Sequence, residues 1–247
     1  MKKFLYITLA TFATVLFGTG CNQNESKVYY SSIVTLIDGS YDYAYSVEFD
    51  DGKTAYVTNS FSHHFTFSDK LNGEGRAYIW YEIADEKKPG FDHSLTLVSL
   101  EPLSTFKLIS INDPDVTDLD KFTASASISE MAYAMNRDYL TMAVNFPAST
   151  TGNYSHQMQL LYNDNPEHEG AYQQYYPTTD DGYLYLELYH NSNGDPGSTN
   201  TQAIACYKVD YNNLHGMQPM SDYKGIKVIQ PVQGGRVEIY TYDFPKQ

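Results

Sequence analysis

The sequence predicts an all-β protein, with a five-stranded barrel followed by a two-sheet sandwich, after an N-terminal signal segment. Three observations predict this fold class. Apolar and polar residues alternate with the period of a strand, and no long helical period is present. Asp-Gly pairs and other turn residues separate the alternating segments. Tyrosine, which favours strands, accounts for 24 residues, against 12 Phe and 1 Trp.

The N-terminus has the features of an export signal. Met1-Lys2-Lys3 is cationic, and Phe4–Phe17 is an uncharged apolar run that is short for a transmembrane helix. Three small residues then precede Cys21, an order that resembles the lipobox of bacterial lipoproteins, although Gly18 replaces the usual apolar residue. The resemblance implies removal of residues 1–20 and lipidation of Cys21. Plain cleavage, which would give a soluble secreted protein, is the alternative.

Lipidation at Cys21 predicts attachment to a membrane, because two or more acyl chains make a stable anchor. The polar residues 21–27 predict a short tether. We therefore expect the protein in the cell envelope, at the outer membrane. The sequence does not decide between the periplasmic face and the cell surface. Removal of the signal takes away Lys2 and Lys3 and changes the formal charge from −14 to −16. A protein this acidic repels nucleic acid and anionic headgroups.

The first domain, residues 28–108, is expected to hold five strands. They are predicted at Val28–Ile37, Tyr43–Phe49, Lys53–Thr58, Gly75–Ala84 and His93–Leu100. The second and third join across Asp50-Asp51-Gly52, where Gly accepts the positive φ of a tight hairpin. The strand count, with a longer insert after the third strand, fits an OB-like barrel. The domain has 6 basic and 12 acidic residues, which excludes a nucleic-acid groove.

Residues 109–122 are expected to be a linker, because Ser110–Lys121 holds four Asp and a Pro but no aromatic residue. Residues 123–247 are expected to form the sandwich, from six or seven short strands separated by polar turns. The strands are predicted at Tyr139–Phe146, Gln157–Tyr162, Gly182–Tyr189, Ala203–Tyr211, Lys224–Ile229 and Arg236–Phe244, with Ser127–Ala134 as the seventh. Apolar and polar residues alternate cleanly in Arg236–Phe244, which predicts a half-buried strand. Cys206, in an apolar strand, is expected to be a buried thiol without a disulfide.

Two segments resemble the NigD-like lipoproteins. They are residues 72–100 (NGEGRAYIWYEIADEKKPGFDHSLTLVSL) and residues 183–196 (YLYLELYHNSNGDP). The order of lipoprotein signal, OB-like domain and C-terminal β-sandwich is also similar to that family. The resemblance implies a Bacteroidetes-type envelope lipoprotein of this architecture. The family is named after a bacteriocin-associated locus, and it supplies no catalytic residues to carry over.

The richest candidate for ligand binding is the segment Tyr172-Gln173-Gln174-Tyr175-Tyr176. Tyr172, Tyr175 and Tyr176 combine rings for stacking with neighbouring amides for hydrogen bonding, as paratopes do. The alternative is that these tyrosines pack a strand edge against the neighbouring domain.

A loop after the third predicted sandwich strand could wrap Ca²⁺. Asn191, Asn193 and Asp195 place oxygen ligands at alternate positions, although Gln202 stands where an EF-hand loop has its bidentate acid. An ordinary hairpin loop is the alternative. His63-His64 and His168 lack the spacing of a metal motif. No cofactor is expected.

No catalytic residues are predicted, and the leading hypothesis is a non-enzymatic, lipid-anchored module that binds an envelope protein, a peptide or a glycan. A hydrolase of envelope polymers that uses Asp92, His93 or His190 is the second hypothesis. For Asp92 and His93 the alternative is an ordinary turn. Self-protection against a bacteriocin is the third hypothesis and rests on the family's name.

Overall fold

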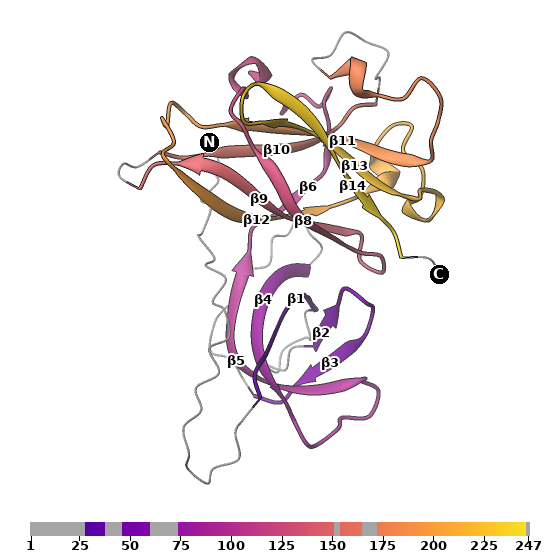
Figure 1. Cartoon of the computed structure of the whole chain (residues 1–247). Helices are drawn as coiled ribbons and strands as arrows, with labels where there is room; N and C mark the ends of the chain where they lie inside the picture. The colour runs from indigo at the N-terminus through magenta and orange to yellow at the C-terminus, as the bar shows by residue number, and fades with distance from the viewer. Residues whose placement is uncertain (1–27, 38–45, 60–73, 151–153, 165–171, 246–247) are drawn as a thin grey trace. The chain divides into compact units, whose positions relative to one another are not determined.

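The computed structural model describes residues 28–37, 46–59, 74–150, 154–164 and 172–245. The chain divides into two compact units, one made mainly from residues up to Thr105 and the other mainly from Phe106 onward. Strands and turns make up both units, with short 3-10 helices described in the second, as Figure 1 shows, and the predicted all-β class is confirmed. In the described ranges, no helix has the length and apolar character needed to cross a bilayer. The predicted signal, Cys21, the tether, His63-His64 and His168 lie outside the described residues.

The first unit is a closed five-stranded barrel. Its strands are β1 (Tyr30–Ile37), β2 (Ser46–Phe49), β3 (Thr54–Val57), β4 (Glu74–Ile83) and β5 (His93–Leu103). They pair in the order β1-β2-β3-β5-β4, β4 closes antiparallel onto β1, and β3 runs parallel to β5. This is the connectivity of a five-stranded Greek-key barrel, and the OB-like prediction is confirmed.

The alternation of the barrel strands explains its core. Buried side chains come from every strand at period two, including Val34, Val47, Ala55, Ile79 and Leu95. The predicted β2–β3 hairpin is present, with Gly52 at φ +84° and its amide bonded to the carbonyl of Phe49. β5 is longer than predicted.

The second unit contains two sheets. Its strands are β6 (Thr105–Lys107), β7 (Ile109–Ser110), β8 (Ser127–Ala134), β9 (Tyr139–Ala148), β10 (Gln157–Tyr162), β11 (Tyr183–Asn191), β12 (Thr199–Lys208), β13 (Gly225–Val232) and β14 (Arg236–Asp243). One sheet has the order β14-β13-β11-β10-β7 and the other β6-β12-β9-β8. β11 pairs parallel with β13, and β10 pairs parallel with β7. The predicted sandwich is confirmed, with all seven expected strands present.

The structure differs from the strand predictions in two ways. β14, predicted to be half-buried, is the edge strand of its sheet: Val237 and Tyr240 on it are partly buried, whereas Ile239 is 40% exposed. Within the predicted linker, β7 pairs with β10, and Ile111, Val116 and Leu119 pack against the buried cluster of the second unit. The apolar residues of the predicted linker, which stand among acidic ones, thus cover the buried cluster of the second unit.

Candidate functional site

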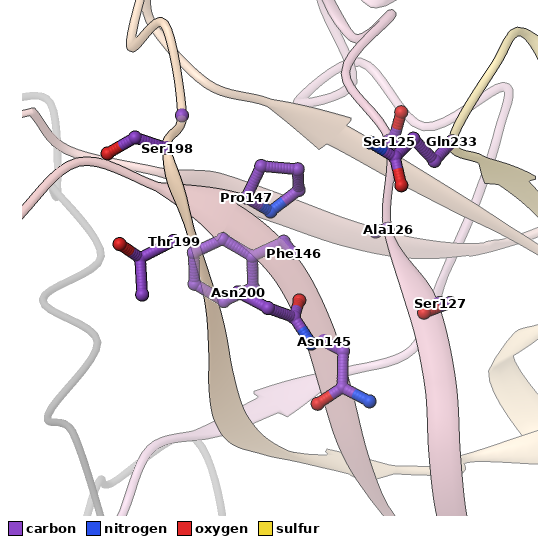
Figure 2. A pocket seen from close by; sticks show the side chains of 11 residues that line it. Ser125, Ala126, Ser127, Asn145, Phe146, Pro147, Ser198, Thr199, Asn200 and Gln233 are labelled. Carbon is purple, nitrogen blue, oxygen red and sulfur yellow. The ribbon is translucent and has the colours of Figure 1, made fainter.

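A pocket of about 390 Å³ opens in the second unit. It lies where β9, the start of β8 and the start of β12 meet the β13–β14 turn. Its lining is Ser125, Ala126, Ser127, Asn145, Phe146, Pro147, Gly197, Ser198, Thr199, Asn200 and Gln233. Figure 2 shows the rings of Phe146 and Pro147 between Ser198 and Thr199 on one side and Ser125 and Gln233 on the other.

The lining is polar and carries no charged side chain. Four of its side chains, those of Ser198, Thr199, Asn200 and Gln233, are exposed and form the rim. None of the four makes a hydrogen bond with another residue in the described part of the chain. Their donors and acceptors therefore face solvent and are available to a ligand.

A single carboxylate fixes one wall of the pocket. Asp195 accepts hydrogen bonds from the amide of Gly197 (2.8 Å), the amide of Ser149 (2.9 Å) and the hydroxyl of Ser149. These bonds tie the loop that enters β12 to the end of β9. Gly197 has φ +54°, and a Cβ there would lie 2.6 Å from Cβ of Pro147, so the backbone needs glycine at this position.

Behind this wall runs a buried chain of polar groups. His156 Nε2 lies 2.9 Å from Oδ2 of Asp195, and His156 Nδ1 lies 2.9 Å from Nε2 of His190. His190 Nδ1 in turn lies 2.8 Å from the carbonyl oxygen of Ser125, a residue of the pocket lining. The two rings are stacked, and the ring of Phe146 packs on both. The chain thus connects two walls of the pocket through the interior.

The acceptors at the two ends of this chain constrain which ring nitrogens carry protons. The carbonyl of Ser125 and the carboxylate of Asp195 can only accept, so each needs an N–H from the ring that faces it. The bond between the rings needs a third N–H. Two neutral imidazoles carry only two. Satisfying all three hydrogen bonds at once would therefore need one additional proton on the pair, whose charge would face the carboxylate of Asp195.

Burial and hydrogen bonding shift the pKa values of His190 and Asp195, at the two ends of this chain. Burial lowers the pKa of His190 to about 4; the bond to the Ser125 carbonyl opposes this shift, and the neighbouring His156 adds to it. Burial opposes ionisation of Asp195, but donors from Ser149, Gly197 and His156 outweigh it and hold the pKa of that carboxyl well below 3.8. Burial thus favours the neutral form of His190, and the three donors favour the ionised form of Asp195.

We expect acid to destabilise the second unit through His190. Its pKa is about 4 in the folded protein and 6.5 as the ordinary value, so the unfolded state binds more protons between these pH values. The contribution of neutral His190 to the free energy of unfolding is fully present above pH 6.5, and about 3 kcal/mol of it is lost as the pH approaches 4. Urea unfolding at several pH values between 7.5 and 4 measures this slope. The His190→Gln variant should flatten it, and an equal slope in both proteins would contradict the assignment.

The predicted Ca²⁺ ligands are held by the protein itself. Besides Asp195, Asn191 Oδ1 accepts the amide of Asn193 (2.8 Å), and Asn193 Nδ2 donates to the carbonyl of Ser155. The described residues contain no group of three or more His, Cys, Asp or Glu placed for a metal ion. A calcium site at Asn191, Asn193 and Asp195 stays a prediction, and the ion would have to replace these donors.

The three predicted ligand-binding tyrosines pack in the buried cluster of the second unit. Tyr172 is buried, and Tyr175 and Tyr176 pack against the same cluster. The hydroxyl of Tyr176 donates to Oε1 of Glu187 (2.7 Å), which is 1% exposed. Burial, followed by the charge of Glu187, raises the pKa of Tyr176. The tyrosines thus take part in the packing of their own unit, and ligand binding by them stays a prediction.

The residues of the hydrolase hypothesis are also engaged. Oδ2 of Asp92 accepts the amide (2.9 Å) and the hydroxyl (3.3 Å) of Thr54, as an ordinary turn residue does. The ring of His93 packs on the edge of Phe49 in the barrel. Cys206 is buried on β12, as predicted, beside the hydroxyl of Thr141.

Sequence reasoning did not identify the pocket or His156. Most of the pocket side chains are common hydroxyls and amides, and the lining comes from four separate segments that no spacing rule connects. One signal was present: the loop 190–196 was selected for its oxygen ligands, and its Asp195 does organise the wall of the pocket.

Residues 111–240 match the family described as the NigD-like C-terminal beta sandwich domain. The fold is similar to that of a protein of unknown function from Bacteroides vulgatus, with 20% identity, a TM-score of 0.63, and coverage of 89% of this chain and 92% of that one. It is also similar to a predicted lipoprotein from Bacteroides fragilis, with 11% identity, a TM-score of 0.61, and coverage of 88% and 99%. A NigD-like immunity protein from Bacteroides caccae has 17% identity, a TM-score of 0.53, and coverage of 87% and 97%. No curated protein sequence matches the chain.

Proposed function

We propose that this protein is a lipid-anchored module of the cell envelope. The chain belongs to the family of the NigD-like C-terminal β-sandwich domain, and the proposal proceeds from that membership. The protein binds an envelope component and catalyses no reaction. The observation that carries the binding role is the polar pocket, whose rim side chains make no hydrogen bond within the described chain.

Two observations support the anchor. The sequence has a cationic start, an apolar run and small residues directly before Cys21. A predicted lipoprotein from Bacteroides fragilis has a similar fold over 88% of this chain. Acyl chains contribute about 0.8 kcal/mol per buried methylene, so a modified Cys21 would hold both domains at the membrane surface.

The hydrogen bonds around the histidines support a binding role rather than catalysis. In Ser-His-Asp hydrolases the serine hydroxyl is bonded to the imidazole, which takes its proton. Here the hydroxyl of Ser149 donates to Asp195 instead, while His156 is bonded to His190 and to Asp195. This arrangement stabilises the loop and provides no activated nucleophile.

We expect Cys21→Ser to abolish membrane attachment. Serine cannot form the thioether that carries the lipid, so the variant should move from the membrane fraction to the soluble fraction and lose the lipid mass. Detergent phase partitioning and mass spectrometry of the full chain measure both changes. Cys206→Ala is the matched control, because Cys206 lies buried in β12 and should not affect partitioning. A wild-type chain that is soluble and carries no lipid would overturn the anchor.

Self-protection against a bacteriocin is a second candidate function. It is favoured by the family match and by the similar fold of the NigD-like immunity protein from Bacteroides caccae. In this case the envelope component is a toxin or its target. A strain without the gene should become sensitive to the toxin of the same strain, and complementation should restore resistance. Unchanged sensitivity would remove this candidate.

A further inference from the structure

We propose that the pocket of the second unit binds an uncharged carbohydrate through its ring hydroxyls. The inference rests on the proposed binding function and assigns it a site and a ligand class. It is carried by the chemistry of the rim, the two apolar rings beneath it and the backbone hydrogen bonds around it.

The rim offers groups that match sugar hydroxyls. Each hydroxyl of Ser198 and Thr199 both donates and accepts a hydrogen bond, and the carboxamides of Asn200 and Gln233 present one acceptor and two donor hydrogens. A sugar hydroxyl also donates and accepts, so each can satisfy the other. None of these rim side chains has a hydrogen-bond partner within the described residues. A ligand of this kind would therefore gain bonds without breaking any in the protein.

The absence of charge from the lining excludes ionic ligands from the favoured class. No Lys or Arg among the lining residues could neutralise a phosphate or a uronate, and no Asp or Glu among them could bind a cation. The formal charge of the chain, −14, adds repulsion against anions. Uncharged polar ligands are left.

The interior of the pocket suits the less polar face of a sugar ring. Pro147 presents its ring there, and Phe146 lies behind it with 3% of its surface exposed, as Figure 2 shows. Apolar C–H groups of a sugar can contact Pro147 while its hydroxyls reach the rim.

The backbone around the pocket argues against an extended peptide. A peptide that adds as a strand needs unpaired backbone groups on a sheet edge. β9 and β12 pair with each other through the pocket, where Phe146 faces Thr201. On the segment that leads into β8, the amides of Ala124, Ala126 and Ile128 donate to His190, Pro231 and Gln230. Recognition must then come from side chains.

The wall of the pocket is fixed before a ligand arrives. Asp195 ties Gly197, next to the rim, to Ser149 on the opposite segment, and the histidine chain supports Ser125. A fixed wall lowers the entropy cost of binding, since fewer groups are ordered by the ligand.

The test uses the full lipidated chain in detergent micelles. The probes are neutral hexose and N-acetylhexosamine oligosaccharides, uronate oligosaccharides and a set of uncharged peptides, measured by calorimetry. We expect binding of a neutral oligosaccharide, weakened between about three- and tenfold by Asn200→Ala and by Gln233→Ala, the range for one lost hydrogen bond. Both residues are exposed, so the fold should be retained. Thr241→Ala, exposed on β14 in the other sheet, is the matched control and should bind as the wild type does.

Other outcomes would overturn the inference. Binding of peptides or uronates in place of neutral sugars, weakened by Asn200→Ala, would exclude the ligand class but leave the proposed binding function intact. Carbohydrate binding that neither variant weakens would move the site elsewhere. If none of the probes binds, the carbohydrate ligand class is overturned. The lipid anchor would be unaffected by that result, because the Cys21→Ser variant tests it independently. Shortening of the oligosaccharide during the experiment would instead overturn the proposal that the protein catalyses no reaction.

Discussion

Replacing Glu187 with Ala is expected to lower the free energy of unfolding of the second unit by about 3 kcal/mol. The carboxylate is 1% exposed and accepts hydrogen bonds from the hydroxyl of Tyr176 (2.7 Å), the hydroxyl of Tyr189 (2.5 Å) and the amide of Asn163 (3.0 Å). Alanine removes one acceptor from each of these three donors and leaves a cavity beside them. Urea unfolding followed by circular dichroism measures the loss.

Two further variants make this prediction specific. Glu187→Gln keeps the shape and one oxygen acceptor, so it should cost about 1 kcal/mol. Glu130→Ala, on an exposed position of β8, should change stability by less than about 0.5 kcal/mol. The segment with Tyr172 and Tyr176 should also exchange its amide hydrogens faster in Glu187→Ala. Equal stability of the Ala and Gln variants would show that the hydrogen bonds to Glu187 do not support the fold.

Replacing Asp50 with Ala is expected to destabilise the barrel by about 3–5 kcal/mol. Arg76 is 1% exposed, and its guanidinium lies 2.7 and 3.0 Å from the two carboxylate oxygens of Asp50. The hydroxyl of Thr35 accepts a further bond (2.9 Å). Without Asp50 the buried charge has lost its counter-ion, which is far costlier than losing an exposed pair. Fluorescence of Trp80, the single Trp of the chain and part of β4, reports the unfolding of the barrel.

The neighbouring Asp51 provides the control. It pairs with Lys53 on the surface at 2.6 Å, with both side chains more than half exposed, and Asp51→Ala should cost no more than about 1 kcal/mol. A double variant, Asp50→Ala with Arg76→Met, should recover part of the stability, because it removes the buried charge together with its partner. If the double variant is less stable than Asp50→Ala alone, the loss does not come from the unpaired charge.

The long strands were predictable because each has enough residues to show its period. β10 was predicted with its observed bounds, and β4 and β11 to within two residues at either end. β6 and β7 are too short to show a period, and they are strands because the edges of β12 and β10 are there to pair with them. Such pairing is decided by the tertiary fold, and local sequence carries no trace of it.

The candidate site was less predictable for a similar reason. Glu187 could have been found, since strand alternation places Tyr185, Glu187 and Tyr189 on one face, and an acid among tyrosines implies hydroxyl donors. The connection of His156 to His190 depends on the register in which β10 pairs with β11, where Met158 faces His190. Neither residue type nor spacing indicates that two histidines so far apart in the sequence come within hydrogen-bond distance.

Because β11 pairs in parallel with β13, the sheet of the sandwich that contains both cannot be completed before β13 has been synthesised. β11 lies inside its sheet, so its edge towards β13 stays open until Gly225–Val232 has left the ribosome. Contacts between such distant segments form slowly, because the entropy of closing the intervening loop must be overcome first. A newly made chain therefore remains unfolded for longer than one built from local hairpins. If the export signal predicted at residues 1–20 directs the chain to a translocation channel, this delay would keep the chain able to thread through it.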